Sequence, residues 1–257
     1  MSFTQFLRRA TPGSTRGFAA EILVIVIGVL IALGAGNVAE EWSWQRKVTA
    51  GEKRLLREGA ANVRYAAEQV VVGPCLDAQL VQLRTRVLRS GDALDPAPLR
   101  SDTGMWDYVV RMPSRPFTDG IWMALNDDGT SGHMADARQQ KHVAAYEQLA
   151  ILQELRAESD LLSGRLMTLA HPLPLDASSR ATLVADIEEQ RARSRFQSLV
   201  AGQILGAYRD LGSLPSDASV ELSLTESGTV AFCHKHGLPL DSWRKVMASE
   251  APSQRED

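Results

Sequence analysis

The longest apolar run in the chain, residues 18–39, constrains the fold more than any other feature. It reads FAAEILVIVIGVLIALGAGNVA, with Glu21 as its one acid and Asn37 as its one amide. As a helix this run would be about 33 Å long, which is enough to cross the hydrocarbon core of a bilayer. The sequence therefore predicts a transmembrane helix whose partner is the lipid bilayer, preceded by a short basic tail, residues 1–17.

The flanks of this run bear on its orientation. Arg16 lies directly before it in a tail without acids, whereas Arg46 and Lys47 follow it after two glutamates. The Lys and Arg counts alone do not separate the two orientations, but a large C-terminal domain can be translocated regardless of its charge. We therefore expect the N-terminus in the cytoplasm and an extracytoplasmic C-terminal domain. Trp42 and Trp44 fall where an interfacial aromatic belt would lie.

A cleaved signal peptide is the alternative interpretation of the same run. The preceding tail is basic, and Gly34, Ala35 and Gly36 resemble the small residues of a cleavage site. However, the apolar run is long, no A-x-A pattern follows it, and helix-forming sequence continues directly beyond it. These features favour an anchor that stays attached.

Small residues recur on one face of the predicted transmembrane helix. Gly28, Ala32 and Gly36 are spaced by four residues, and Glu21 falls on nearly the same face. Such a stripe lets two helices approach closely, and a carboxyl group is costly when it faces lipid. A homodimer through this face is one interpretation of the stripe. The alternative is that small residues are merely common in membrane helices and that Glu21 reaches the headgroups.

The remaining sequence is dominated by helical periodicity. Apolar residues recur at helical spacing over residues 40–72, 75–89, 135–170 and 176–211, with Gly73-Pro74 and Gly212 as breaks. The fold class expected is mainly α, with a transmembrane helix continuing into an extramembrane helical bundle over residues 40–248 and a disordered tail at 249–257. In the last long helix the residues expected to point inward are Leu183, Ile187, Phe196, Val200, Ile204 and Leu211.

Two short stretches are ambiguous. Val220, Leu222 and Leu224 alternate with polar residues, which favours a strand but leaves a helix open. Residues 104–112 fit either a short helix or a strand.

Charge and motif content exclude several function classes. A net charge of -3 without a polybasic stretch argues against a nucleic-acid partner. No G-x-S-x-G, H-E-x-x-H or phosphate-binding Gly loop is present, so no enzymatic activity and no cofactor are expected. The densest metal-capable group is Cys233-His234-Lys235-His236, which alone is short of the three or four facing ligands that zinc needs. A surface turn or a disulfide end is the expected interpretation of this group.

The chain has two cysteines, Cys75 and Cys233. They fit one disulfide in an oxidising compartment or two buried thiols in a reducing one. If they are bridged, their Cα atoms should lie within about 7 Å of each other.

Four aromatic residues gather in a proline-bounded region between the helices. They are Trp106, Tyr108, Phe117 and Trp122. They would form either a core plug under a loop or an aromatic-lined pocket for a small ligand.

The anchor is similar to that of an uncharacterised family of bacterial single-pass membrane proteins. That family carries E-x-x-L-I-V-x-G-I-L-I-A-L, which Glu21, Gly28 and Ala32 match, although the exit Asn37-Val38-Ala39-Glu40-Glu41-Trp42 differs from the family's N-x-W-x-E type. A second stretch, residues 117–149, resembles the family's later pattern through Trp122, Gly129, Arg138 and Tyr146. Because the family has no assigned activity, the resemblance implies a bacterial inner (plasma) membrane location and a helical domain only.

These observations lead to three functional hypotheses. The first is a non-enzymatic scaffold or interaction protein of the bacterial cell envelope. The second is an extracytoplasmic domain that senses a small ligand in a pocket near Trp122, and the third is an envelope enzyme. A filled polar interior would favour the first, a deep aromatic pocket the second, and convergent His and acid side chains in a cleft the third.

Overall fold

The computed structural model describes residues 15–100 and 107–249, and it is mainly helical, as the sequence predicts. In this described part the extended backbone forms only two isolated bridges, Ala93 with Pro174 and Arg100 with Tyr108, and no strand. The elements in chain order are α1 (Thr15–Val71), α2 (Gly73–Arg89), α3 (Gly120–Asp127), the 3-10 helix η2 (Thr130–His133), α4 (Asp136–Leu166), the 3-10 helix η3 (Met167–Ala170), α5 (Ala177–Asp210), α6 (Asp217–Thr225), α7 (Gly228–Lys235) and α8 (Trp243–Ser249).

The chain divides into two compact units, residues 1–50 and 51–257. The first unit carries the apolar part of α1, whose large side chains between Ile22 and Val38 are 46 to 70% exposed. In the described part of the chain, α1 is the one helix long and apolar enough to cross a membrane, and its most apolar window buries nothing inside the protein. That exposure distinguishes it from the core helix of a soluble protein. Most of the basic tail, residues 1–14, lies outside the described residues.

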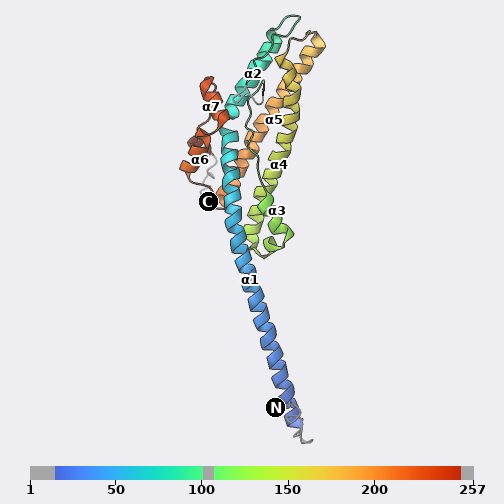
Figure 1. Cartoon of the computed structure of the whole chain (residues 1–257), viewed down its shortest axis with the longest axis vertical. Coiled ribbons are helices and arrows are strands. Elements are labelled where there is room, and N and C mark those ends of the chain that lie inside the picture. Colours follow the sequence, from blue (N-terminus) through green and yellow to red (C-terminus); the bar gives the residue numbers. More distant parts are fainter. Residues whose placement is uncertain (1–14, 101–106, 250–257) are drawn as a thin grey trace, which may run out of the picture. The chain divides into compact units, whose positions relative to one another are not determined.

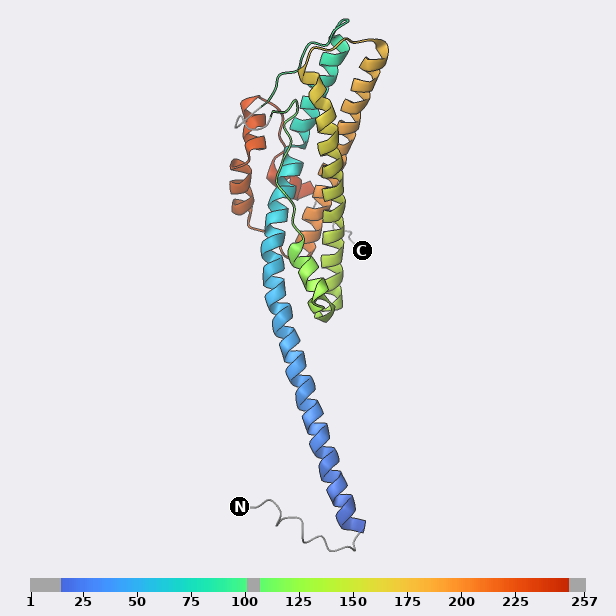
Figure 2. The same cartoon turned by 45° about the vertical axis from the view of Figure 1, so that its right-hand side comes forward.

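In the second unit α5 packs along both α2 and α4, and these helices run side by side in both views (Figures 1 and 2). Local signals set the ends of α5. Asp176 accepts a hydrogen bond of 2.7 Å from the Ser179 amide, and the Asp176 amide donates one of 3.0 Å to Ser179 Oγ. Gly212 follows the helix with φ of 65°, a conformation that glycine adopts without strain. The predicted break at Gly73-Pro74 is also present, since α1 ends at Val71 and Gly73-Pro74 begins α2 after the single residue Val72.

The core of the second unit contains buried polar side chains. As a result, the residues of α5 that face inward differ from those predicted. Ile187, Val200 and Ile204 are buried as expected, but Phe196 is 47% exposed, so its predicted inward position is wrong. Its neighbour Gln197 takes the inward position. The Gln197 amide donates to the Leu155 carbonyl at 2.9 Å and to Ser159 Oγ at 2.8 Å, which satisfies it inside the bundle.

The strand favoured around Val220 is also wrong, because residues 217–225 form α6. The Ser216 side chain caps this helix by accepting from the Ser219 amide. Val220 and Leu224, one helical turn apart, are 0% and 9% exposed, whereas Leu222 between them is 59% exposed. The alternation in the sequence was therefore accidental, and the spacing of four decided which residues are buried.

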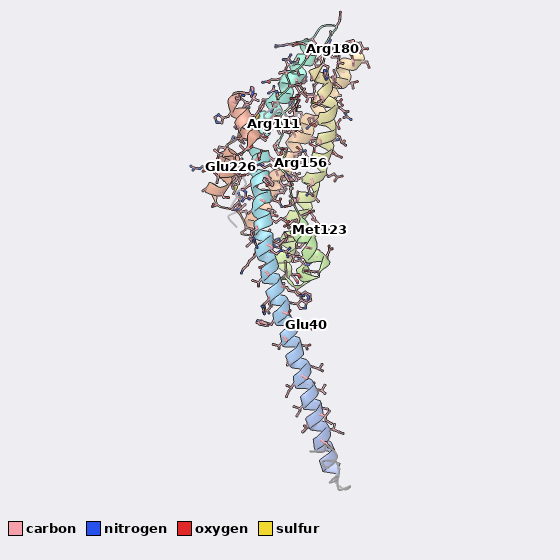
Figure 3. All side chains as sticks on the ribbon, viewed as in Figure 1. Glu40, Arg111, Met123, Arg156, Arg180 and Glu226 are labelled. Atoms are coloured by element: carbon pink, nitrogen blue, oxygen red, sulfur yellow. A yellow bond between two sulfur atoms is a disulfide. The ribbon has the colours of Figure 1, made fainter. Side chains whose placement is uncertain are left out.

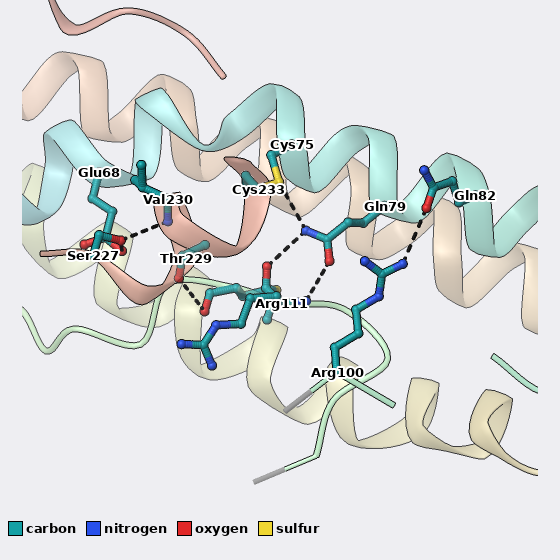
Figure 4. Close-up of a disulfide and its surroundings, with 11 residues drawn as sticks. Glu68, Cys75, Gln79, Gln82, Arg100, Arg111, Ser227, Thr229, Val230 and Cys233 are labelled. Carbon is teal, nitrogen blue, oxygen red and sulfur yellow. Dashed lines mark hydrogen bonds between the residues drawn. A yellow bond between two sulfur atoms is a disulfide. The ribbon is translucent and has the colours of Figure 1, made fainter. Parts of the chain in front are cut away.

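Residues 107–119 run as an extended segment against the helices without forming a strand or a helix. A buried backbone outside regular structure must still find hydrogen-bond partners, and side chains supply them. The Asn62 side chain donates to the Thr118 carbonyl at 2.6 Å and accepts from the Thr118 amide at 3.0 Å. The Gln79 side chain pairs with both backbone groups of Arg111 in the same way, at 3.2 and 2.8 Å (Figure 4).

Arg156 holds the same segment from α4. Its guanidinium donates to the carbonyls of Arg115 and Pro113, and it is labelled midway along the bundle in Figure 3. The 107–119 segment is thus fixed by side chains from α1, α2 and α4.

Candidate functional site

The residues of the predicted packing stripe lie on the exposed part of α1. Glu21 and Ala32 are exposed. A Cβ atom added to Gly28 or Gly36 would meet nothing within 4 Å, so these two positions are open to an approaching helix. The exposed stripe is compatible with lipid or with a second copy of the chain as its neighbour.

Two tryptophans follow the apolar run, and each stacks against a cation on its own helix. The Arg46 guanidinium lies 4.7 Å from the Trp42 ring centroid, and the Lys47 ammonium lies 4.0 Å from that of Trp44. Rings with an adjacent cation suit the boundary between apolar chains and charged headgroups.

Cys75 and Cys233 form a disulfide, with Cα atoms 6.1 Å apart. This fulfils the distance expected of a bridged pair and joins α2 to α7 across 158 residues of sequence. Both cysteines are fully buried beside Phe232. Because Cys233 is bridged, it has no thiolate to offer a metal. Among the described residues no group of three or more His, Cys, Asp or Glu side chains could hold a metal ion.

The described residues of the expected aromatic pocket are Tyr108, Phe117 and Trp122, and they have different surroundings. Trp106 lies outside the described residues. Trp122 is 7% exposed, and its indole stacks on Tyr146 at 5.3 Å and on His142 at 5.7 Å between ring centroids. Phe117 packs edge-on against Tyr65, with centroids 6.1 Å apart. Both rings are therefore enclosed by neighbouring side chains.

A polar cluster that sequence reasoning missed surrounds Trp122. The Tyr146 hydroxyl donates to Glu58 Oε1 at 2.7 Å, and the Ile121 amide at the start of α3 donates to Glu58 Oε2 at 2.9 Å. Burial and the nearby Glu58 and Tyr208 raise the pKa of Tyr146, so its hydroxyl stays protonated and serves as a donor. The resemblance did single out Trp122 and Tyr146, but only the fold brings Glu58 to them.

The ionic contacts between α2 and α5 centre on Asp77. Arg191 Nε lies 2.7 Å and Arg195 Nη2 2.9 Å from Asp77 Oδ1. The hydrogen bond from Arg191 lowers the pKa of Asp77 below its ordinary value. Asp77 and Arg191 are half-buried and Arg195 is exposed, and these contacts join α2 to α5.

Tyr108, from the same expected set, lines a cleft. This cleft has a volume of about 450 Å³ and lies between the 107–119 segment and α4. Neither Phe117 nor Trp122 is among the described residues that line it.

Comparison of the chain with protein-family models, with curated proteins and with solved structures gives no match. The resemblance of the anchor to the uncharacterised membrane family therefore depends on the matching residues themselves.

Proposed function

We propose that the protein is a single-pass, membrane-anchored scaffold or interaction protein of the bacterial cell envelope, without enzymatic activity of its own. In this proposal residues 18–39 cross the inner (plasma) membrane once. The N-terminal tail stays in the cytoplasm, and residues 40–248 lie on the extracytoplasmic side of the membrane. The match of Glu21, Gly28 and Ala32 to the uncharacterised bacterial family supports the choice of membrane.

The filled interior of the second unit is the observation that carries the non-enzymatic assignment. Gln79 is 0% and Gln197 4% exposed, and each uses its amide to bond backbone or a neighbouring side chain. Trp122 is covered by two rings instead of opening into a pocket. Satisfied polar groups of this kind fix one packing arrangement. Contacts with partners would then be made by the outer surface of this unit and by the transmembrane helix.

The disulfide supports the extracytoplasmic location, because structural disulfides persist in oxidising compartments and are rare in the cytosol. A pair of C-terminal fusions tests this part of the proposal. We expect activity from alkaline phosphatase, which folds only outside the cytoplasm, and no fluorescence from a fusion to a protein that is fluorescent only inside it. The reverse pattern would place the domain in the cytoplasm and overturn the location.

Homodimer formation through Gly28, Ala32 and Gly36 is the interaction that we propose for the transmembrane helix. A self-association reporter carrying residues 18–39 should lose signal in Gly28→Ile and Gly36→Ile, because the added side chains separate the two backbones. Gly34→Ile is the matched control, since Gly34 is equally open but lies off the stripe. Equal signal in all variants would show that the stripe does not pack.

A further inference from the structure

The cleft beside Tyr108 has an apolar floor. Val110, which is 5% exposed, and the flexible side chains of Met112 and Met167 line it together with the Tyr108 ring. Methionine adapts its shape to different apolar groups. The Arg111 guanidinium already lies 6.0 Å from the Tyr108 ring centroid, so this ring adds apolar surface to the cleft. The volume of about 450 Å³ is in the range of small-ligand sites.

The cation and the two acids that line the cleft differ in how far they are free to bind a ligand. Arg156 is the one cation among its described lining residues, and its guanidinium is already bound to the carbonyls of Arg115 and Pro113. Asp107 and Asp160 also line the cleft. Asp160 interacts through its charge with Arg156, but in the described part of the chain neither carboxylate lies within ion-pair distance of a cation. An anionic ligand would therefore meet two carboxylates and a guanidinium whose donors are already bound to carbonyls, whereas a cationic ligand would meet two exposed carboxylates.

We propose that this cleft binds a small amphipathic cation, an amine with an aromatic or aliphatic body. The ammonium group pairs with Asp160 and Asp107 at the rim, and the apolar body rests on Val110, Met112 and Met167. This site goes beyond the scaffold role and does not depend on it.

Two substitutions test the site without disturbing the fold. Asp160 is exposed, so Asp160→Asn removes its charge at nearly constant size. Gly164 lines the cleft within α4, and a Cβ atom there meets nothing within 4 Å, so Gly164→Leu adds bulk beside the cleft. Leucine also favours a helix more than glycine does. Asp136→Asn is the matched control, because Asp136 is an exposed acid of the same helix that does not line the cleft.

The experiment is a calorimetric titration of the full-length protein in phosphatidylcholine nanodiscs, with empty nanodiscs subtracted. The probes are phenethylamine, neutral 2-phenylethanol and anionic phenylacetate, which share one aromatic body. We expect saturable binding of the amine, weakened roughly fivefold by Asp160→Asn, or about 1 kcal/mol. Gly164→Leu should abolish binding, and Asp136→Asn should leave it unchanged. No saturable binding of the amine, equal affinity for all three probes, or unchanged binding in Asp160→Asn and Gly164→Leu would overturn the proposal.

Discussion

His142 brings a titratable ring into the contact between α4 and α3. It is 4% exposed, and neither ring nitrogen has a hydrogen-bond partner in the described structure. Burial is the main cause that lowers the pKa of His142, and the neighbouring Arg138 lowers it further, while Glu52 on α1 acts in the opposite direction. From α3 the ring meets Trp122, which has no charge. The folded domain therefore holds His142 neutral at neutral pH.

This burial predicts a loss of stability in mild acid. The unfolded chain protonates His142 near its ordinary pKa of about 6.5, whereas the folded chain resists protonation until a lower pH. Stability is thus complete above that value and falls as the pH drops from 7 towards 5. We expect the melting temperature of His142→Phe to fall less over this interval than that of the native chain, as measured by thermal circular dichroism. Parallel curves would show that His142 is not the responsible group.

Gly59 is required by a close approach between α1 and α5. A Cβ atom at this position would lie 2.3 Å from Cε1 of the Tyr208 ring, which cannot move aside because it is 2% exposed. Gly59→Ala should therefore lower the free energy of unfolding by about 1–3 kcal/mol, even though alanine favours helices. Gly206→Ala on α5, where nothing lies within 4 Å, should be neutral or stabilising. Urea denaturation of both variants measures the contrast, and equal midpoints would contradict the predicted clash.

At the level of elements, the 107–119 segment depends on side chains for its backbone hydrogen bonds. Gln79 on α2 is fully buried and pairs with the amide and the carbonyl of Arg111. Removing it takes one hydrogen-bond partner from each of these two groups, and a buried group left unsatisfied costs about 1–3 kcal/mol. Gln79→Ala should destabilise the domain and speed proteolysis within the segment. Gln82→Ala, an exposed change one turn along α2, should do neither.

The C-terminal end of α2 also receives hydrogen bonds from a side chain of another helix. Arg180, from the first turn of α5 and labelled at the top of Figure 3, donates to the carbonyls of Val87 and Gly91. The last carbonyls of a helix lack partners within it, and a cation is well suited to that position. Here too, a side chain from one element supplies hydrogen bonds to the backbone of another.

At the scale of the whole molecule, the disulfide covalently links two residues that are far apart in the sequence. It closes a loop of 158 residues between α2 and α7, which limits the unfolded chain more than the folded one. The double variant Cys75→Ser, Cys233→Ser should lose roughly 2–5 kcal/mol of stability. Denaturation of the native chain with a reductant should approach the same midpoint, while the reductant should leave the variant unchanged. An identical midpoint for variant and oxidised native chain would mean that packing alone fixes α7.

Sequence alone determined the features that depend on neighbouring residues. The apolar run around Gly28 predicts a helix able to span a bilayer. A helix that is apolar on all sides cannot shield its own side chains from water. Gly73-Pro74 and Gly212 predicted helix ends because proline lacks an amide hydrogen and glycine adopts positive φ. The mainly α class followed from the same local periodicity.

The tertiary structure decided whatever depends on residues far apart in the chain. Phe196 is exposed because Gln197 finds partners on α4, and Leu222 is exposed because α6 turns Val220 inward. The pairing of Cys75 with Cys233 and the burial of Trp122 under His142 and Tyr146 likewise depend on helix packing. Composition and residue spacing do not reveal such contacts, because each contact joins residues that come together only when the chain has folded.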